Sequence, residues 1–203
     1  MNPSTTAIIL IGFQDDYFST DGTLHDLLED SAGTRAVLGR TVGMLKSLRD
    51  SPVTMISTPI IFSPDYSEVR QTDGLLLAIR EAQAFKAGTP GAETVDELQA
   101  FGDRIQEIPG KRGFNAFTDT GLARVLGDAS ITHVVIAGAV TSICIDSTGR
   151  AAYELGMQVS ILSDCTAART NVEQEFFCST IFPVYATLRT ADEVVASLRQ
   201  GAH

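Results

Sequence analysis

The chain has 203 residues, of which 44% are hydrophobic, so residues 1–203 are expected to form a single domain with a buried core and not a disordered chain. Its 25 acidic and 15 basic residues give a net charge of −10, which argues against a nucleic-acid partner because phosphate contacts need clustered Lys and Arg. No apolar run approaches the roughly 20 residues of a membrane span, and none has the positive flank of a signal peptide. The three cysteines are sparse and odd in number, which favours free thiols and a cytoplasmic location.

Apolar runs and helical periodicity alternate along the chain. In chain order, the pattern predicts a strand at 7–11, a helix at 31–49, a strand at 53–58, a short helix at 74–83, a helix at 92–101, a strand at 104–109, a helix at 120–126, a strand at 133–140, a helix at 142–155, a strand at 158–163, and helices at 172–185 and 191–199. The long irregular connection 59–91 is typical of a functional loop that shapes a pocket. Its aromatic residues are expected to pack in the core; they are Phe62, Tyr66 and Phe85.

Strands that alternate with helices predict parallel pairing, and strands that are apolar throughout predict a sheet covered on both faces. The expected fold is therefore α/β, with three α/β/α layers around a mostly parallel, doubly wound sheet. Ligands of such sheets bind outside the carboxyl ends of the strands. Three points lie at such ends: Gly12, Lys111 and the segment 138–144.

Cys144 is a candidate nucleophile because it falls in the first turn of the helix that follows the strand 133–140. Thr141 or Ser142 is a plausible N-cap. The partial positive charge and free N–H groups of a helix start favour a thiolate and could bind an oxyanion. A buried structural cysteine and a redox-sensing thiol are the alternatives, whereas Cys165 and Cys178 are expected to be structural.

Lys111 is a candidate cationic partner, since it lies just beyond the strand 104–109 in "EIPGKRGFNAF". A lysine beside a thiol stabilises the thiolate, and beside a carbonyl it can polarise or orient that group. The residue pattern alone leaves an ordinary solvated loop lysine open as the alternative.

Together these segments resemble the isochorismatase-like cysteine hydrolases, a superfamily that includes nicotinamidases and N-carbamoylsarcosine amidohydrolases. "IILIGFQDDYF" is similar to the opening motif D-x-Q-x-D-F, and "KRGFNAFTDTGL" is similar to the lysine motif. "AGAVTSICIDSTGRAAYELG" resembles the cysteine motif, and "VSILSDCTAA" the strand after it. The resemblance covers nearly the whole chain and implies the isochorismatase-like hydrolase fold.

In that family an aspartate, a lysine and a cysteine act on a carbonyl, usually of an amide. The resemblance places the cysteine at Cys144 and the lysine at Lys111. It also implies a non-proline cis peptide between Val140 and Thr141, which would aim the N–H groups of Thr141 and Cys144 into an oxyanion hole. Tyr17 and Phe117 are expected to line the pocket with position 12, and the family commonly forms a homodimer or a higher homo-oligomer.

The departure from the family is at Gly12, which stands where the catalytic aspartate is expected, while Asp16 matches a second, structural aspartate. A thiolate already held by Lys111 could suffice for a substrate with a good leaving group. Alternatively, Asp15, Asp16 or a substrate carboxylate could reach the site, or the protein could bind a ligand without turning it over. The plain structural reason for a glycine here is a strand end with an unusual backbone conformation.

The leading functional hypothesis is a small-molecule hydrolase that cleaves a C–N bond or an activated acyl bond through a thioester at Cys144. The alternative is an impaired or inactive family member that acts in ligand binding or assembly. No cofactor is expected. No metal is expected either, because the histidines are scattered at His25, His133 and His203.

Overall fold

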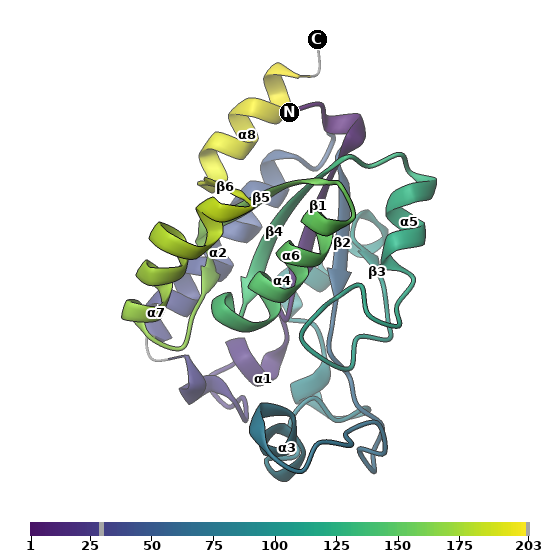
Figure 1. Cartoon of the computed structure of the whole chain (residues 1–203), viewed down its shortest axis with the longest axis vertical. Coiled ribbons are helices and arrows are strands. Elements are labelled where there is room, and N and C mark those ends of the chain that lie inside the picture. The colour runs from purple at the N-terminus through teal and green to yellow at the C-terminus, as the bar shows by residue number, and fades with distance from the viewer. Residues whose placement is uncertain (29–30, 202–203) are drawn as a thin grey trace.

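The structure is a computed structural model that describes residues 1–28 and 31–201. Its centre is a parallel sheet with the strand order β3-β2-β1-β4-β5-β6 (Figure 1). The strands are β1 Thr6–Ile11, β2 Thr54–Thr58, β3 Gln106–Glu107, β4 His133–Ala139, β5 Gln158–Ala167 and β6 Thr187–Arg189. Every residue of β1 is buried, and Ile9 pairs with Ile56 on one side and Ile136 on the other. The predicted doubly wound parallel sheet is confirmed.

Helices cover both faces of this sheet, which gives the three predicted layers (Figure 1). The helices that pack on the two faces include α2 Ser31–Ser47, α5 Leu122–Asp128, α6 Asp146–Glu154 and α8 Ala191–Gln200. Successive side chains of a strand point to opposite faces, and β1 divides accordingly. Ile8 and Leu10 pack in the cluster that holds α2 and α8, whereas Ile9 packs in the cluster that holds α5 and α6.

The segment after β1 and the segment after β2 are held to each other by buried polar side chains. The short helices here are α1 Asp15–Phe18, α3 Gly74–Glu81 and α4 Asp96–Gln99. The amide of Gln14 donates to the carbonyl oxygens of Ile60 and Ala92, and its oxygen accepts from the N–H of Ile60. Within the loop, the aromatic side chains predicted to be core residues are buried, namely Phe62, Tyr66 and Phe85. The loop is therefore fixed against the sheet edge.

The prediction of one continuous helix over 172–185 is wrong. The structure has α7 Asn171–Phe176, then a π-helical turn Phe177–Ile181 and a 3-10 turn Phe182–Val184. Pro183 explains the change, because proline lacks the N–H that a continuing α-helix would need.

Two strands also differ from the prediction. β6 was not predicted, and the predicted strand 104–109 is limited to Gln106–Glu107. No helix among residues 1–28 and 31–201 is both long and apolar enough to cross a bilayer.

Candidate active site

The three points predicted at strand ends meet at the carboxyl edge of the sheet. Gly12 follows β1, whose last residue, Ile11, pairs with Gly138 of β4. Lys111 pairs with Ile60, two residues beyond the end of β2, so it lies along the same edge. Parallel pairing thus brings residues about 100 positions apart in sequence into one small region.

Cys144 and Lys111 are in direct contact. Lys111 Nζ lies 3.5 Å from Cys144 Sγ, and it also donates to the carbonyl oxygen of Gly113 at 2.6 Å. Lys111 is only 1% exposed and Cys144 only 5% exposed, so the interpretation of Lys111 as a solvated loop lysine is wrong. Within the part of the chain that the structure describes, no carboxylate forms an ion pair with Lys111. Lys111 Nζ is therefore in contact with a carbonyl oxygen and with the sulfur of Cys144.

The turn that carries Cys144 is π-helical, from Thr141 to Ile145, and α6 continues from Asp146. The carbonyl of Val140 accepts hydrogen bonds from the N–H groups of Ile143 at 3.0 Å and Ile145 at 3.2 Å, the residues on either side of Cys144. The predicted side-chain N-cap at Thr141 or Ser142 is wrong, because Val140 occupies that position without a capping side chain. Single π turns of this kind are frequent at functional sites.

The cis peptide bond lies between Ala139 and Val140, so the expected bond between Val140 and Thr141 is wrong by one residue. The cysteine motif identified the correct segment. The cis bond joins the last residue of β4 to the residue that precedes the π turn. Gly138, just upstream, has φ +128°, and a Cβ there would collide with the carbonyl oxygen of Ile11. The neighbouring strand therefore requires a glycine at 138.

Gly12 has φ +67°, in the left-handed region that disfavours side chains. A Cβ on this residue would lie 2.9 Å from the carbonyl oxygen of Ala139 and 3.4 Å from Cε2 of Tyr17. The backbone conformation and the close approach of β4 therefore give a structural reason for glycine at position 12. Position 12, where the resemblance leads us to expect an aspartate, is bordered by the main chain of Ala139 and by the Tyr17 ring.

The two aromatic residues predicted to line the pocket lie on different sides of the sheet. Tyr17 is buried, and its ring is 4.9 Å from that of Phe85 between centroids. Burial, and then negative charge on Cys144 and Asp16, raise the pKa of Tyr17 well above its usual value, so its hydroxyl stays protonated. Phe117 is half-buried against the core cluster that contains Cys144.

The acidic residues after Gly12 have other surroundings. Asp16 is buried and accepts hydrogen bonds from the backbone N–H groups of Phe85 and Thr23, which agrees with the structural role that the motif implies. Burial, followed by repulsion from Asp96 and other nearby carboxylates, raises the pKa of Asp15. Neither carboxylate is an ion-pair partner of Lys111 among the described residues.

Sequence reasoning missed one polar residue, Gln174 of α7. The hydroxyl of Thr141, which is fully buried, donates to Gln174 Oε1 at 2.6 Å. Nothing in the sequence marks this contact, because the two residues are 33 positions apart and Gln174 has the appearance of a solvated helix residue.

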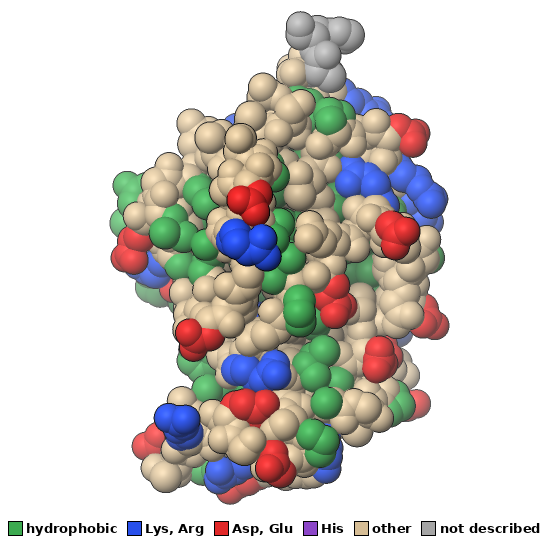
Figure 2. Space-filling model, turned by 90° about the vertical axis from the view of Figure 1, so that its right-hand side faces the viewer, with side chains coloured by type: hydrophobic (Ala, Val, Ile, Leu, Met, Phe, Trp, Pro, Cys, Tyr) green, Lys and Arg blue, Asp and Glu red, His purple; other side chains and the backbone are tan. Residues whose placement is uncertain are grey.

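Metal-binding side chains do not gather at the site. Among the described residues, no group of three His, Cys, Asp or Glu side chains could hold a metal ion. His133 is at the opposite end of β4 from the π turn, where its Nε2 lies 2.8 Å from Ser160 Oγ. His203 lies outside the described residues. On the face shown in Figure 2, basic and acidic side chains are interspersed with apolar ones.

The fold of the chain is similar to that of solved structures. A cysteine hydrolase from Pseudomonas syringae pv. phaseolicola superposes with a TM-score of 0.86 at 22% identity, over 99% of this chain and 95% of that one. At this identity the likeness shows the fold.

The amino-acid sequence identifies the family to which the chain belongs. The isochorismatase domain matches residues 6–193, and the chain belongs to that family. An uncharacterized isochorismatase family protein of Escherichia coli O157:H7, YecD, is 27% identical over 208 residues, which cover 98% of both chains. The ureidoacrylate amidohydrolase RutB of Rhizobium rhizogenes is 28% identical over 213 residues, which cover 89% of this chain and 85% of the relative.

Proposed function

We propose that the protein is a small-molecule hydrolase that cleaves a C–N bond of an amide, or an activated acyl bond, through a thioester at Cys144. The observation that carries this proposal is the buried contact between Lys111 Nζ and Cys144 Sγ at 3.5 Å, at the ligand-binding edge of the sheet. Membership of the isochorismatase domain family and the similarity to an amidohydrolase support a C–N bond as the target.

In the first half-reaction the thiolate of Cys144 attacks the carbonyl carbon of the substrate and a C–S bond forms. The carbonyl oxygen becomes an oxyanion, which in this proposal accepts hydrogen bonds from backbone N–H groups of the turn that carries Cys144. The C–N bond then breaks, and the leaving amine takes a proton from the ammonium of Lys111. The products of this step are a thioester, a free amine and a neutral Lys111.

In the second half-reaction water attacks the thioester carbonyl and gives its proton to neutral Lys111. The C–S bond breaks, the carboxylic acid leaves, and the thiolate is restored beside the ammonium. Lys111 thus takes the acid–base role that Gly12 cannot fill. A positioned acid–base group contributes typically 10²- to 10⁴-fold. Because an ester or activated acyl leaving group needs less help from an acid, such substrates are expected to react faster than plain amides.

The proposal also includes the assembly and the surroundings of the enzyme. Two large apolar side chains of α7 are exposed, Val172 at 78% and Phe176 at 51%, which supports a homodimer or higher homo-oligomer. Light scattering of the purified protein measures that state directly. The three free cysteines are compatible with a reducing, cytoplasmic location.

The test is a hydrolase screen with ureido acids, primary amides and p-nitrophenyl esters, in which the wild-type chain is compared with Cys144→Ala and Cys178→Ala. Turnover is expected in the wild type and in Cys178→Ala, and loss is expected in Cys144→Ala. After acid quench and digestion, peptide mass spectrometry is expected to show an acyl adduct on the peptide that contains Cys144. Equal turnover in Cys144→Ala would refute the mechanism. Ligand binding without any turnover would favour the inactive, ligand-binding alternative that the missing aspartate at Gly12 suggests.

A further inference from the structure

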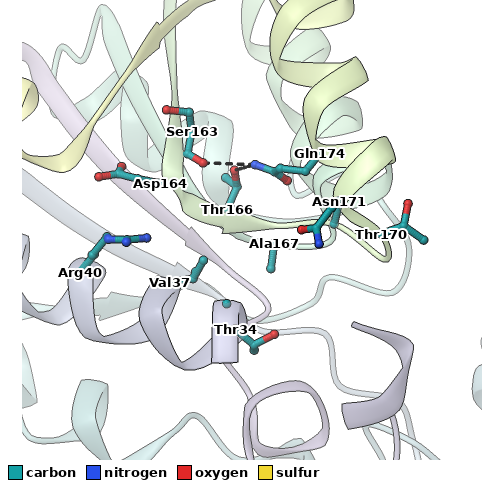
Figure 3. Close-up of a pocket in the computed structure, with 12 residues that line it drawn as sticks. Thr34, Val37, Arg40, Ser163, Asp164, Thr166, Ala167, Thr170, Asn171 and Gln174 are labelled. Atoms are coloured by element: carbon teal, nitrogen blue, oxygen red, sulfur yellow. Dashed lines mark hydrogen bonds between the residues drawn. The ribbon is translucent and has the colours of Figure 1, made fainter. Parts of the chain in front are cut away.

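A polar cavity lies between α2 and the carboxyl end of β5. Its volume is about 180 Å³, and its walls come from α2, from β5 with the loop that follows, and from α7 (Figure 3). Ligands of parallel sheets bind outside the carboxyl ends of the strands, and β5 ends here at Ala167. The residues that line the cavity do not include Cys144, Lys111 or Gly12, so the cavity is separate from the candidate active site.

Two opposite charges line this cavity without forming an ion pair. Figure 3 shows Arg40 on α2 and Asp164 on β5 at the same end of the cavity. Among the described residues, neither side chain forms an ion pair with the other or with a further charged group. Burial has the largest effect in raising the pKa of the Cys165 thiol, but the charge of Asp164 adds to the rise and that of Arg40 opposes it. Both charges therefore lie close to one residue of β5.

The carboxylate of Asp164 is held by the main chain of α8. Its Oδ1 accepts a hydrogen bond at 3.0 Å from the N–H of Ala191, the first residue of that helix. The side chain is therefore presented to the cavity in a fixed orientation. An asparagine at position 164 could keep this bond through its own carbonyl oxygen, so the charge can be removed without removing the contact.

Amide side chains of α7 form another part of the wall. Gln174 Nε2 donates to the carbonyl oxygen of Ser163 at 3.2 Å and to Thr166 Oγ1 at 3.1 Å (Figure 3). These bonds fix Gln174 against β5. Asn171 lies three residues earlier in α7 and lines the same cavity with an amide that can donate or accept. The cavity thus has polar walls on both sides.

We propose that this cavity binds a small zwitterionic amino acid, with the carboxylate of the ligand on Arg40 and its ammonium on Asp164. A guanidinium matches a carboxylate with two parallel N–H···O bonds, and a carboxylate accepts charge-assisted hydrogen bonds from an ammonium. A cavity of about 150 Å³ takes a ring of six carbon atoms, so a ligand of roughly six to eight non-hydrogen atoms fits here. Alanine and serine are of this size.

The first measurement is isothermal titration calorimetry of the wild-type chain with L-alanine and with L-serine. Propionate, which carries only the carboxylate, and ethylamine, which carries only the ammonium, are the comparison probes. The amino acids are expected to bind at least about tenfold more tightly than either probe, because each probe leaves one charged side chain without its partner.

The second measurement repeats the titration with variants. Arg40→Gln and Asp164→Asn each remove one charge, and each is expected to weaken binding of the amino acid at least about tenfold. Matched controls change the same residue types at exposed positions that do not line the cavity, with Arg35→Gln in α2 and Asp192→Asn in α8. Both controls are expected to keep Kd within about twofold. Thermal unfolding of each variant verifies that it is folded.

Cys144→Ala distinguishes this cavity from the candidate active site, and its Kd for the amino acid is expected to equal that of the wild type. The inference is overturned if the wild type binds neither amino acid, if propionate or ethylamine binds as tightly, or if Arg40→Gln or Asp164→Asn binds like the wild type. Loss of binding in Cys144→Ala would also overturn it, because the ligand would then lie at the candidate active site. The hydrolase screen is a separate test, since none of these outcomes depends on turnover.

Discussion

Substitution of Gly12 tests whether the backbone or the chemistry requires glycine at this position. In Gly12→Ala the new Cβ would lie 2.9 Å from the carbonyl oxygen of Ala139, a main-chain atom that cannot rotate away as the end of a side chain can. The residue would also hold φ +67°, which costs about 1–3 kcal/mol for a residue other than glycine. We therefore expect the free energy of unfolding to fall by about 1–3 kcal/mol. In a chain of this size Tm falls about 2–4 °C per kcal/mol, so a loss of roughly 2–12 °C is expected by calorimetry.

Gly12→Asp carries the same Cβ and adds a carboxylate where the resemblance leads us to expect the catalytic aspartate. Because the strain is the same, its Tm is expected to match that of Gly12→Ala to within a few degrees. Its kcat/KM, measured well below both midpoints, is not expected to exceed that of Gly12→Ala. Wild-type Tm together with a tenfold rise in kcat/KM in Gly12→Asp would refute this reasoning. Such a result would mean that the strand end accepts the carboxylate and that the natural activity is residual.

Three further predictions concern other titratable groups. Lys111→Met is expected to slow alkylation of Cys144 by iodoacetamide at least tenfold, because it removes the positive charge beside the sulfur. Its Tm is not expected to fall, because the substitution removes a buried charge and keeps the side-chain volume. An unchanged alkylation rate would contradict the proposed pair of Lys111 and Cys144. Wild-type protein at pH 8 is expected to be alkylated first at Cys144, as read by peptide mass spectrometry, since burial raises the pKa of Cys165 to about 12 and also raises that of Cys178. Burial, followed by the charge of a nearby arginine, lowers the pKa of His133 to about 4 from an unfolded value near 6.5, so the unfolded state binds more protons between these values. Stability is therefore expected to fall as pH falls from about 6.5 to about 4, and His133→Gln should flatten this dependence in urea titrations.

The fold was predictable because its signals are local and repeated. Strands such as β1 and β4 are continuous apolar runs, and only a sheet covered on both faces buries such runs. β6 escaped prediction because Thr187–Arg189 is a short edge strand that pairs with β5 alone and carries no apolar run. Its place in the sheet is set by pairing with β5, which no local pattern of three residues reveals.

The site was predictable only in part, for a related reason. Cys144 and Lys111 follow strands, so the topology alone brings them to one edge. The capping error came from the preference of Ser and Thr for N-caps, whereas the Thr141 hydroxyl is engaged by Gln174 from another element. The strain at Gly12 likewise depends on the carbonyl of Ala139 in the neighbouring strand. Contacts of this kind exist only after the chain has folded.

A glycine at position 12, where the resemblance leads us to expect a carboxylate, bears on the proposed role of Lys111. An ammonium has three N–H donors, of which Lys111 directs one to the carbonyl of Gly113 and one to Cys144. A carboxylate nearby would compete with the sulfur for these donors and add a second negative charge that opposes the thiolate. In the proposed mechanism, one N–H of Lys111 remains for a substrate atom, and the nucleophilic sulfur of Cys144 lies directly beside the lysine. The proposed mechanism thereby joins nucleophile and acid in one pair, so it favours substrates whose leaving group needs little help from an acid.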